Sequence, residues 1–152
     1  MRDYGTVSPK FWQAGTGKAL RGDPDAQILA LYLMTSPHSN MIGIYFCTLG
    51  SMSYETGIPL EGASKALRRL EEEGFCRFDA ETDEVFVVSM ATHQIGERLD
   101  ARDNRCKSVA RELAKVNSPQ LQAAFCAVYA DRFHILNATS GPVDNKGLNS
   151  PF

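Results

Sequence analysis

The sequence predicts an α+β protein, mainly α-helical, that folds as one domain over residues 1–135. Several segments place hydrophobic residues at helical spacing between capping residues, and shorter runs rich in β-branched and aromatic residues are bounded by turn residues. With 152 residues, 43% of them hydrophobic, the chain is long enough to bury one core and short for two. Residues 136–152 are rich in Gly, Ser, Pro and Asn, so we expect a flexible linker or tail there.

The first elements can be placed from their start and stop residues. Phe11 and Trp12 follow a Ser-Pro start signal and predict a short helical turn packed on the body. The next helix has Asp23 as its N-cap and Pro24 at its first position, and it ends before Pro37. Its apolar residues lie on all sides, which predicts a central, buried helix. They are Ile28, Leu29, Leu31, Tyr32, Leu33 and Met34.

The middle of the chain predicts a strand, two helices and a hairpin. Residues 41–46 (MIGIYF) are rich in strand formers, and a short helix starting near Ser51 or Ser53 closes at Gly57. The stretch PLEGASKALRRLEEEGF, residues 59–75, predicts an amphipathic helix that stops at Gly74. Its expected buried stripe is Leu60, Ala63, Leu67 and Leu70. The hairpin is expected to have strands at 76–79 and 84–88 around a turn at 80–83.

The order helix, strand, helix, helix, strand, turn, strand is that of a winged helix-turn-helix. In that architecture the third helix and the hairpin flank a DNA groove. Residues 91–105 are polar and predict a connection to two further helices, at 103–116 and 119–133. The expected fold is therefore a winged helix-turn-helix with a short three-stranded sheet and two C-terminal helices. The apolar helix at 119–133 either caps the core or pairs with a second copy in a homodimer.

The helix at residues 59–75 carries the first candidate DNA-binding residues. We expect Ser64, Lys65, Arg68 and Arg69 to face phosphates or base edges from the side opposite Leu67. The alternative is a solvated face with its own ion pairs at i,i+4 spacing, each worth about 0.2–0.5 kcal/mol. Those pairs would be Glu61–Lys65, Arg68–Glu72 and Arg69–Glu73.

The hairpin is acidic, which opposes contact with DNA. Residues 59–88 contain four cations and eight anions, so this region has a net charge of −4. The hairpin tip should therefore point away from a duplex, whose backbone carries one charge per ~1.7 Å. Its carboxylates are instead candidates for binding a protein partner. These residues are Asp79, Glu81 and Asp83.

A second basic feature lies in the helix at residues 103–116. Lys107, Arg111 and Lys115 follow one another at i, i+4 and i+8, and Arg105 lies near the start of this ridge. Few anions oppose them locally, so we expect the ridge to face an anion such as DNA. Because the whole chain has a net charge of −2, DNA binding requires these cations and those of residues 59–75 to gather on one surface.

Signals for an enzyme are weak. GTGK at residues 15–18 resembles a phosphate-binding loop, but Trp12 and Ala19 occupy positions where that motif needs Gly and Ser or Thr. The three histidines have no metal-ligand spacing, and the four cysteines stand far apart with no C-x-x-C pair. We therefore expect no catalysis, no metal and no cofactor. The absence of a signal sequence and of a long apolar run predicts a cytoplasmic protein with no membrane contact.

Several stretches together resemble the N-terminal part of phage and prophage replication proteins, the winged-helix replisome organisers or replication initiators. The stretches are SPKFW, ILALYLMTSPHSNMIGIYF, GASKALRRLEEEGFCRFD, VVSMATHQIGE and DNRCKSVARELAKV. The resemblance covers residues 4–133, and its most specific element runs from Leu29 to Gly43. In such proteins a low-complexity linker often leads to a second domain, and NKGLNSPF resembles the start of that linker.

The resemblance implies a module that binds origin or fork DNA in the cytoplasm of a bacterial host and helps recruit the replicative helicase or its loader. It also implies that His38 is a turn or capping residue rather than a ligand. Two other functions fit the same fold. One is an adaptor that holds the helicase or loader through the acidic hairpin, and the other is a phage transcription regulator.

Overall fold

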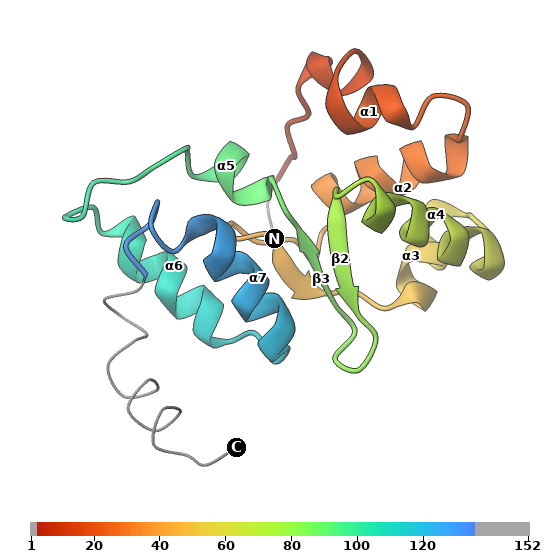
Figure 1. Ribbon diagram of the computed structural model, residues 1–152. Helices are drawn as coiled ribbons and strands as arrows, with labels where there is room; N and C mark the ends of the chain where they lie inside the picture. Colours follow the sequence, from red (N-terminus) through yellow and green to blue (C-terminus); the bar gives the residue numbers. More distant parts are fainter. Residues whose placement is uncertain (1–2, 136–152) are drawn as a thin grey trace.

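The computed structural model describes residues 3–135 and shows an α+β protein with one small antiparallel sheet (Figure 1). The predicted tail at 136–152 lies outside the described residues. The helices are η1 (Pro9–Trp12), α1 (Gly15–Ala19), α2 (Pro24–Thr35), α3 (Leu49–Thr56), α4 (Leu60–Glu72), α5 (Met90–Gln94), α6 (Arg105–Ala114) and α7 (Pro119–Tyr129). The strands are β1 (Ile44–Phe46), β2 (Cys76–Asp79) and β3 (Glu84–Val87).

The sheet lies between two layers of helices. Its strands follow the order β1-β3-β2, and both neighbouring pairs are antiparallel. Successive side chains of β3 point to opposite faces, so Val85 and Val87 join one buried cluster while Phe86 joins another. The first cluster contains residues of α2, α3 and α4, and the second contains residues of α6 and α7. Figure 1 shows these two groups of helices on opposite sides of the sheet.

The helix α2 begins at the residues that the capping pattern predicts. The Asp23 carboxylate accepts a hydrogen bond of 3.2 Å from the Ala26 N–H, and Pro24 is the first helical residue, as predicted. The helix is not buried on all sides, however. Ile28 is 45% exposed, because α3 and α4 pack against only part of the α2 surface.

The first strand and the following helix begin at other residues than expected. Only residues 44–46 of the predicted strand pair with β3, because Gly43 adopts a φ of 79° in a turn where its N–H donates to the Asn40 side chain. The helix α3 starts at Leu49, since the Thr48 hydroxyl accepts from the Ser51 N–H as N-cap. Its predicted stop is confirmed at Gly57, which has a φ of 78°.

The buried stripe of α4 differs from the prediction at one position. Leu60 is 56% exposed, because as the first helical residue it lies beyond the end of the packed cluster. The side chains that α4 buries are Ala63, Ala66, Leu67 and Leu70. The hairpin and its turn agree with the prediction to within one residue. The helix α6 is shorter than expected at both ends, and α7 is shorter at its C-terminal end.

Two short helices were not predicted. The helix α1 covers the whole GTGK stretch, and α5 begins what was expected to be a polar connection. Each is followed by a leucine with no or almost no exposed surface, Leu20 after α1 and Leu99 after α5. These side chains anchor segments whose local sequence is otherwise polar or rich in glycine. No helix within residues 3–135 is long and apolar enough to cross a bilayer.

Candidate nucleic-acid interface

The outward side of α4 presents two exposed cations. Its buried side chains hold it against α2 and α3, and the helical repeat then directs Lys65 and Arg68 away from the core. Ser64 lies half-buried at the edge of this face. We call the exposed pair Lys65 and Arg68 the α4 cation pair.

The alternative interpretation of α4, a face neutralised by its own ion pairs, applies to one residue. The Arg69 guanidinium lies 3.3 Å from the Glu73 carboxylate. The other two expected pairs, of Lys65 with Glu61 and of Arg68 with Glu72, do not occur among the ion pairs of residues 3–135. Both cations of the α4 pair can therefore reach an external anion without first breaking an internal ion pair.

Arg69 holds α4 in place rather than facing outward. Its Nη2 donates to the Ala19 carbonyl at the end of α1, at 2.9 Å. Its Nη1 lies 3.7 Å from the Asp23 carboxylate, which also caps α2. These contacts fix α4 against α1 and α2, and no sequence pattern around Arg69 indicates a partner 50 residues away.

A polar contact between α2 and α3 fixes the helix that precedes α4. The Tyr32 hydroxyl donates to the Glu55 carboxylate at 2.6 Å, and His38 Nε2 lies 3.4 Å from the same oxygen. Burial, reinforced by this carboxylate, raises the pKa of Tyr32 above its usual range, so the phenol remains a donor. The backbone N–H of His38 also donates to the Ser36 hydroxyl, in keeping with the turn role expected for this residue.

The predicted ridge on α6 is broken up by ion pairs. Lys115 lies 3.0 Å from Glu112, and Arg105 lies 2.9 Å from Asp103. Lys107 and Arg111 are exposed and belong to none of the ion pairs within the described part of the chain. The ridge is thus reduced to two cations that can bind an anion without losing an internal partner.

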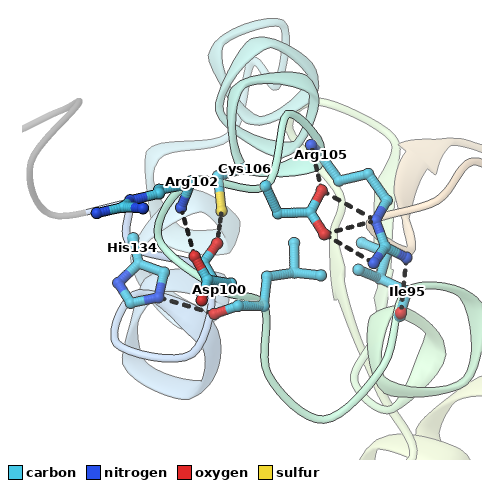
Figure 2. A network of polar contacts seen from close by, with 8 residues as sticks. Ile95, Asp100, Arg102, Arg105, Cys106 and His134 are labelled. Carbon is cyan, nitrogen blue, oxygen red and sulfur yellow. Dashed lines mark hydrogen bonds and ion pairs between the residues drawn. The ribbon is translucent and has the colours of Figure 1, made fainter.

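Figure 2 shows the internal partners of Arg105. Its guanidinium donates through Nε and Nη2 to the Asp103 carboxylate and through Nη1 to the Ile95 carbonyl at 3.3 Å. The hydrogen bonds from Arg105 hold the pKa of Asp103 below its usual value. Arg102 joins this network through its backbone N–H alone, and its side chain points away (Figure 2). The network fixes the connection between α5 and α6.

The two basic helices do not form one surface. The α4 cation pair belongs to the layer that packs on Val85 and Val87, whereas α6 belongs to the layer that packs on Phe86. The sheet therefore separates Lys65 and Arg68 from Lys107 and Arg111, as Figure 1 shows for the two helices. The expectation that these cations gather on one surface is wrong, and a DNA site on one side of the sheet can use only one of the two sets. The sequence could not reveal this, because the spacing of apolar residues shows which face of a helix is buried and not what it packs on.

The acidic hairpin uses part of its charge inside the protein. Asp79 Oδ2 accepts a hydrogen bond of 2.5 Å from the Ser118 hydroxyl, which holds the pKa of this carboxyl below its usual value. Glu84 is 5% exposed and accepts from the N–H groups of Asn117 and Ser118. Of the three predicted partner-binding residues, Glu81 is exposed, whereas Asp79 and Asp83 are half-buried.

Residues 3–135 contain no group of three or more His, Cys, Asp or Glu side chains placed to hold a metal ion. Cys47, Cys76, Cys106 and Cys126 are all free thiols, two buried and two half-buried. Comparison with protein-family models, with curated proteins and with solved structures finds no match to this chain.

Proposed function

We propose that this chain is a DNA-binding module with a winged helix-turn-helix architecture, in which α4 enters the major groove. The order α2, β1, α3, α4, β2, β3 and the antiparallel sheet support this proposal. A turn of three residues joins α3 to α4, and its first residue is a glycine at positive φ. Recognition helices of this class place exposed polar residues against base edges and phosphates.

The α4 cation pair is the observation that carries the proposal. Lys65 and Arg68 are exposed and lie one turn apart. Neither belongs to an ion pair within residues 3–135, so a phosphate contact costs no internal electrostatic energy. Arg69 contributes by fixing the orientation of the helix that carries them.

The hairpin has a different role in this proposal from the usual phosphate-binding wing. Its tip is acidic, and Asp79 and Glu84 bind the start of α7. The hairpin therefore supports the C-terminal helices and turns its remaining charge away from the duplex. An adaptor function through the hairpin is less favoured, because it needs an Asp79 carboxylate that Ser118 already occupies.

We further propose a role in phage replication initiation, at origin or fork DNA, with recruitment of the replicative helicase or its loader. This part depends on the resemblance of residues 29–43 and the neighbouring stretches to phage replisome organisers. A phage transcription regulator would use the same fold and the same α4 surface.

Fluorescence anisotropy with a labelled duplex, across a series of salt concentrations, tests the DNA proposal. We expect binding that weakens steeply with salt, with a log–log slope of about −0.9 per phosphate contacted. The double variant Lys65→Gln/Arg68→Gln should weaken binding and make the slope shallower by about 1.8, the value for two lost contacts. The matched control, Lys107→Gln/Arg111→Gln on the opposite layer, should leave binding unchanged. Absence of duplex binding at about 50 mM salt would refute the proposal.

A further inference from the structure

The segment that precedes α2 is basic although the chain as a whole is acidic. Residues 4–22 contain Lys10, Lys18 and Arg21 and no Asp or Glu, whereas the net charge of the chain is −2. Lys18 and Arg21 are exposed, and neither belongs to an ion pair within residues 3–135. This segment played no part in the DNA-binding site expected from the sequence.

Packing fixes the position of these cations. Leu20 is completely buried in the cluster that also contains α4 side chains, and Phe11 packs against that cluster. The helices η1 and α1 are in backbone contact, since a Cβ on Gly17 would lie 1.3 Å from the Phe11 carbonyl oxygen. Arg21 Nη2 donates to the Trp12 carbonyl at 2.9 Å, which closes the segment on itself. The cations therefore lie on a fixed surface, so binding an anion costs little backbone entropy.

The Arg69 side chain links this segment to α4. The hydrogen bond from Arg69 to the Ala19 carbonyl joins the end of α1 to α4. Lys18 is the residue before Ala19, and Lys65 lies one helical turn before Arg69 on the same side of α4. Figure 1 shows α1 on the same side of the sheet as α2 and α4. Lys18 and Lys65 thus belong to the two helices that the Arg69 contact links, and each lies near that contact in the sequence.

We propose that Lys18 and Arg21 bind the phosphate backbone of the duplex whose groove α4 enters, and this inference rests on the proposed DNA-binding function. The N-terminal segment and α4 together supply cations on a fixed backbone in one layer of the protein. Such cations are the usual partners of a phosphate backbone. The contact extends the DNA-binding surface beyond α4. It also compensates for the acidic hairpin. In winged-helix proteins with a basic wing, the wing supplies phosphate contacts, and in this chain the N-terminal segment supplies them instead.

The variants Lys18→Glu and Arg21→Gln test this contact in the full chain by anisotropy against salt, with the labelled duplex as probe. Each should weaken binding, and Arg21→Gln should make the slope shallower by about 0.9. Arg21→Lys keeps the charge and should retain most of the binding. Lys107→Glu on the opposite layer makes the same charge change as Lys18→Glu and should leave affinity and slope at their original values. Thermal melting verifies that each variant is folded, and within residues 3–135 the Lys18 side chain has no hydrogen bond to lose.

The possible outcomes separate this inference from the function on which it rests. If Lys65→Gln/Arg68→Gln weakens binding while Lys18→Glu and Arg21→Gln do not, the DNA proposal stands and the N-terminal contact is refuted. If Lys107→Glu weakens binding as much as Lys18→Glu, the effect is one of net charge and the contact is again refuted. If the unaltered chain does not bind the duplex, both proposals fail.

Discussion

The carboxylate of Glu84, at the start of β3, accepts a hydrogen bond of 2.7 Å from the backbone N–H of Ser118, the N-cap of α7. A second bond, of 3.0 Å, comes from the Asn117 N–H. The N–H groups at the start of a helix lack partners within the helix, and the helix dipole makes a negative charge favourable there. A strand residue therefore completes the cap of a helix 34 positions further along the chain.

Glu84→Gln tests the energetic value of this contact. The substitution keeps the size of the side chain but removes the charge, and its amide group offers one oxygen where two N–H groups need an acceptor. We expect the free energy of unfolding to fall by about 1–3 kcal/mol, measured by chemical denaturation. Glu81→Gln in the exposed turn serves as control and should change stability by less than about 0.5 kcal/mol. Equal effects of the two substitutions would show that Glu84 does not cap α7.

The contact between Asp79 and Ser118 predicts a dependence of stability on acid pH. Because the folded-state pKa of Asp79 lies below its usual value, its stabilising effect is complete above the unfolded-state value. The effect is lost as the pH falls through the folded-state value. Ser118→Ala removes the main cause of the shift, so its free energy of unfolding should decrease less steeply between about pH 5 and pH 2 than that of the unaltered chain. Parallel pH profiles for the two proteins would contradict this assignment.

Two glycines with the same backbone angle should respond differently to alanine. Gly43 and Gly57 have φ values of 79° and 78°. A Cβ at Gly43 would lie 2.6 Å from Met90 Cβ and 2.7 Å from the Val87 carbonyl oxygen, whereas nothing lies within 4 Å of a Cβ at Gly57. Gly57→Ala should cost about 1–2 kcal/mol from backbone strain alone. Gly43→Ala should cost about 1–3 kcal/mol more because of the overlap. Similar melting temperatures for both variants would contradict the packing of β3 and α5 around Gly43.

The inward face of α4 can be tested with a pair of leucines. Leu70 is completely buried, so Leu70→Ala should lower the free energy of unfolding by about 2–5 kcal/mol. Leu60 is 56% exposed, and Leu60→Ala should cost less than about 1 kcal/mol. Urea denaturation of the two variants measures this difference. An equal loss of unfolding free energy for both variants would contradict the exposed position of Leu60 and support the buried stripe predicted from the sequence.

The sequence predicted the elements whose boundaries are set by neighbouring residues. Asp23 and Pro24 start α2, Gly57 ends α3, and the turn residues of the hairpin separate β2 from β3. These signals act within a few residues and can be read directly from the chain. The α+β class and the three-stranded sheet followed from them.

Features that depend on tertiary contacts could not be predicted. The helix α1 is held by Leu20 and by Arg69, which lies 50 residues from its partner carbonyl. The charges of the hairpin suggested an external partner, because nothing near Glu84 indicates the start of α7. The separation of the candidate basic surface into two parts also depends on tertiary contacts. Helical spacing identified Lys107 and Arg111 as outward-facing but could not show that α6 and α4 lie on opposite faces of the sheet.

The most direct test of DNA binding through α4 is a titration of the isotope-labelled chain with a short duplex, followed by NMR of the backbone amides at low salt. If DNA binds as proposed, chemical-shift changes should be concentrated on α4 around Lys65 and Arg68 and on residues 18–21, with little change on α6. Changes concentrated at Lys107 and Arg111 or on the hairpin turn, or no changes at all, would contradict the proposal.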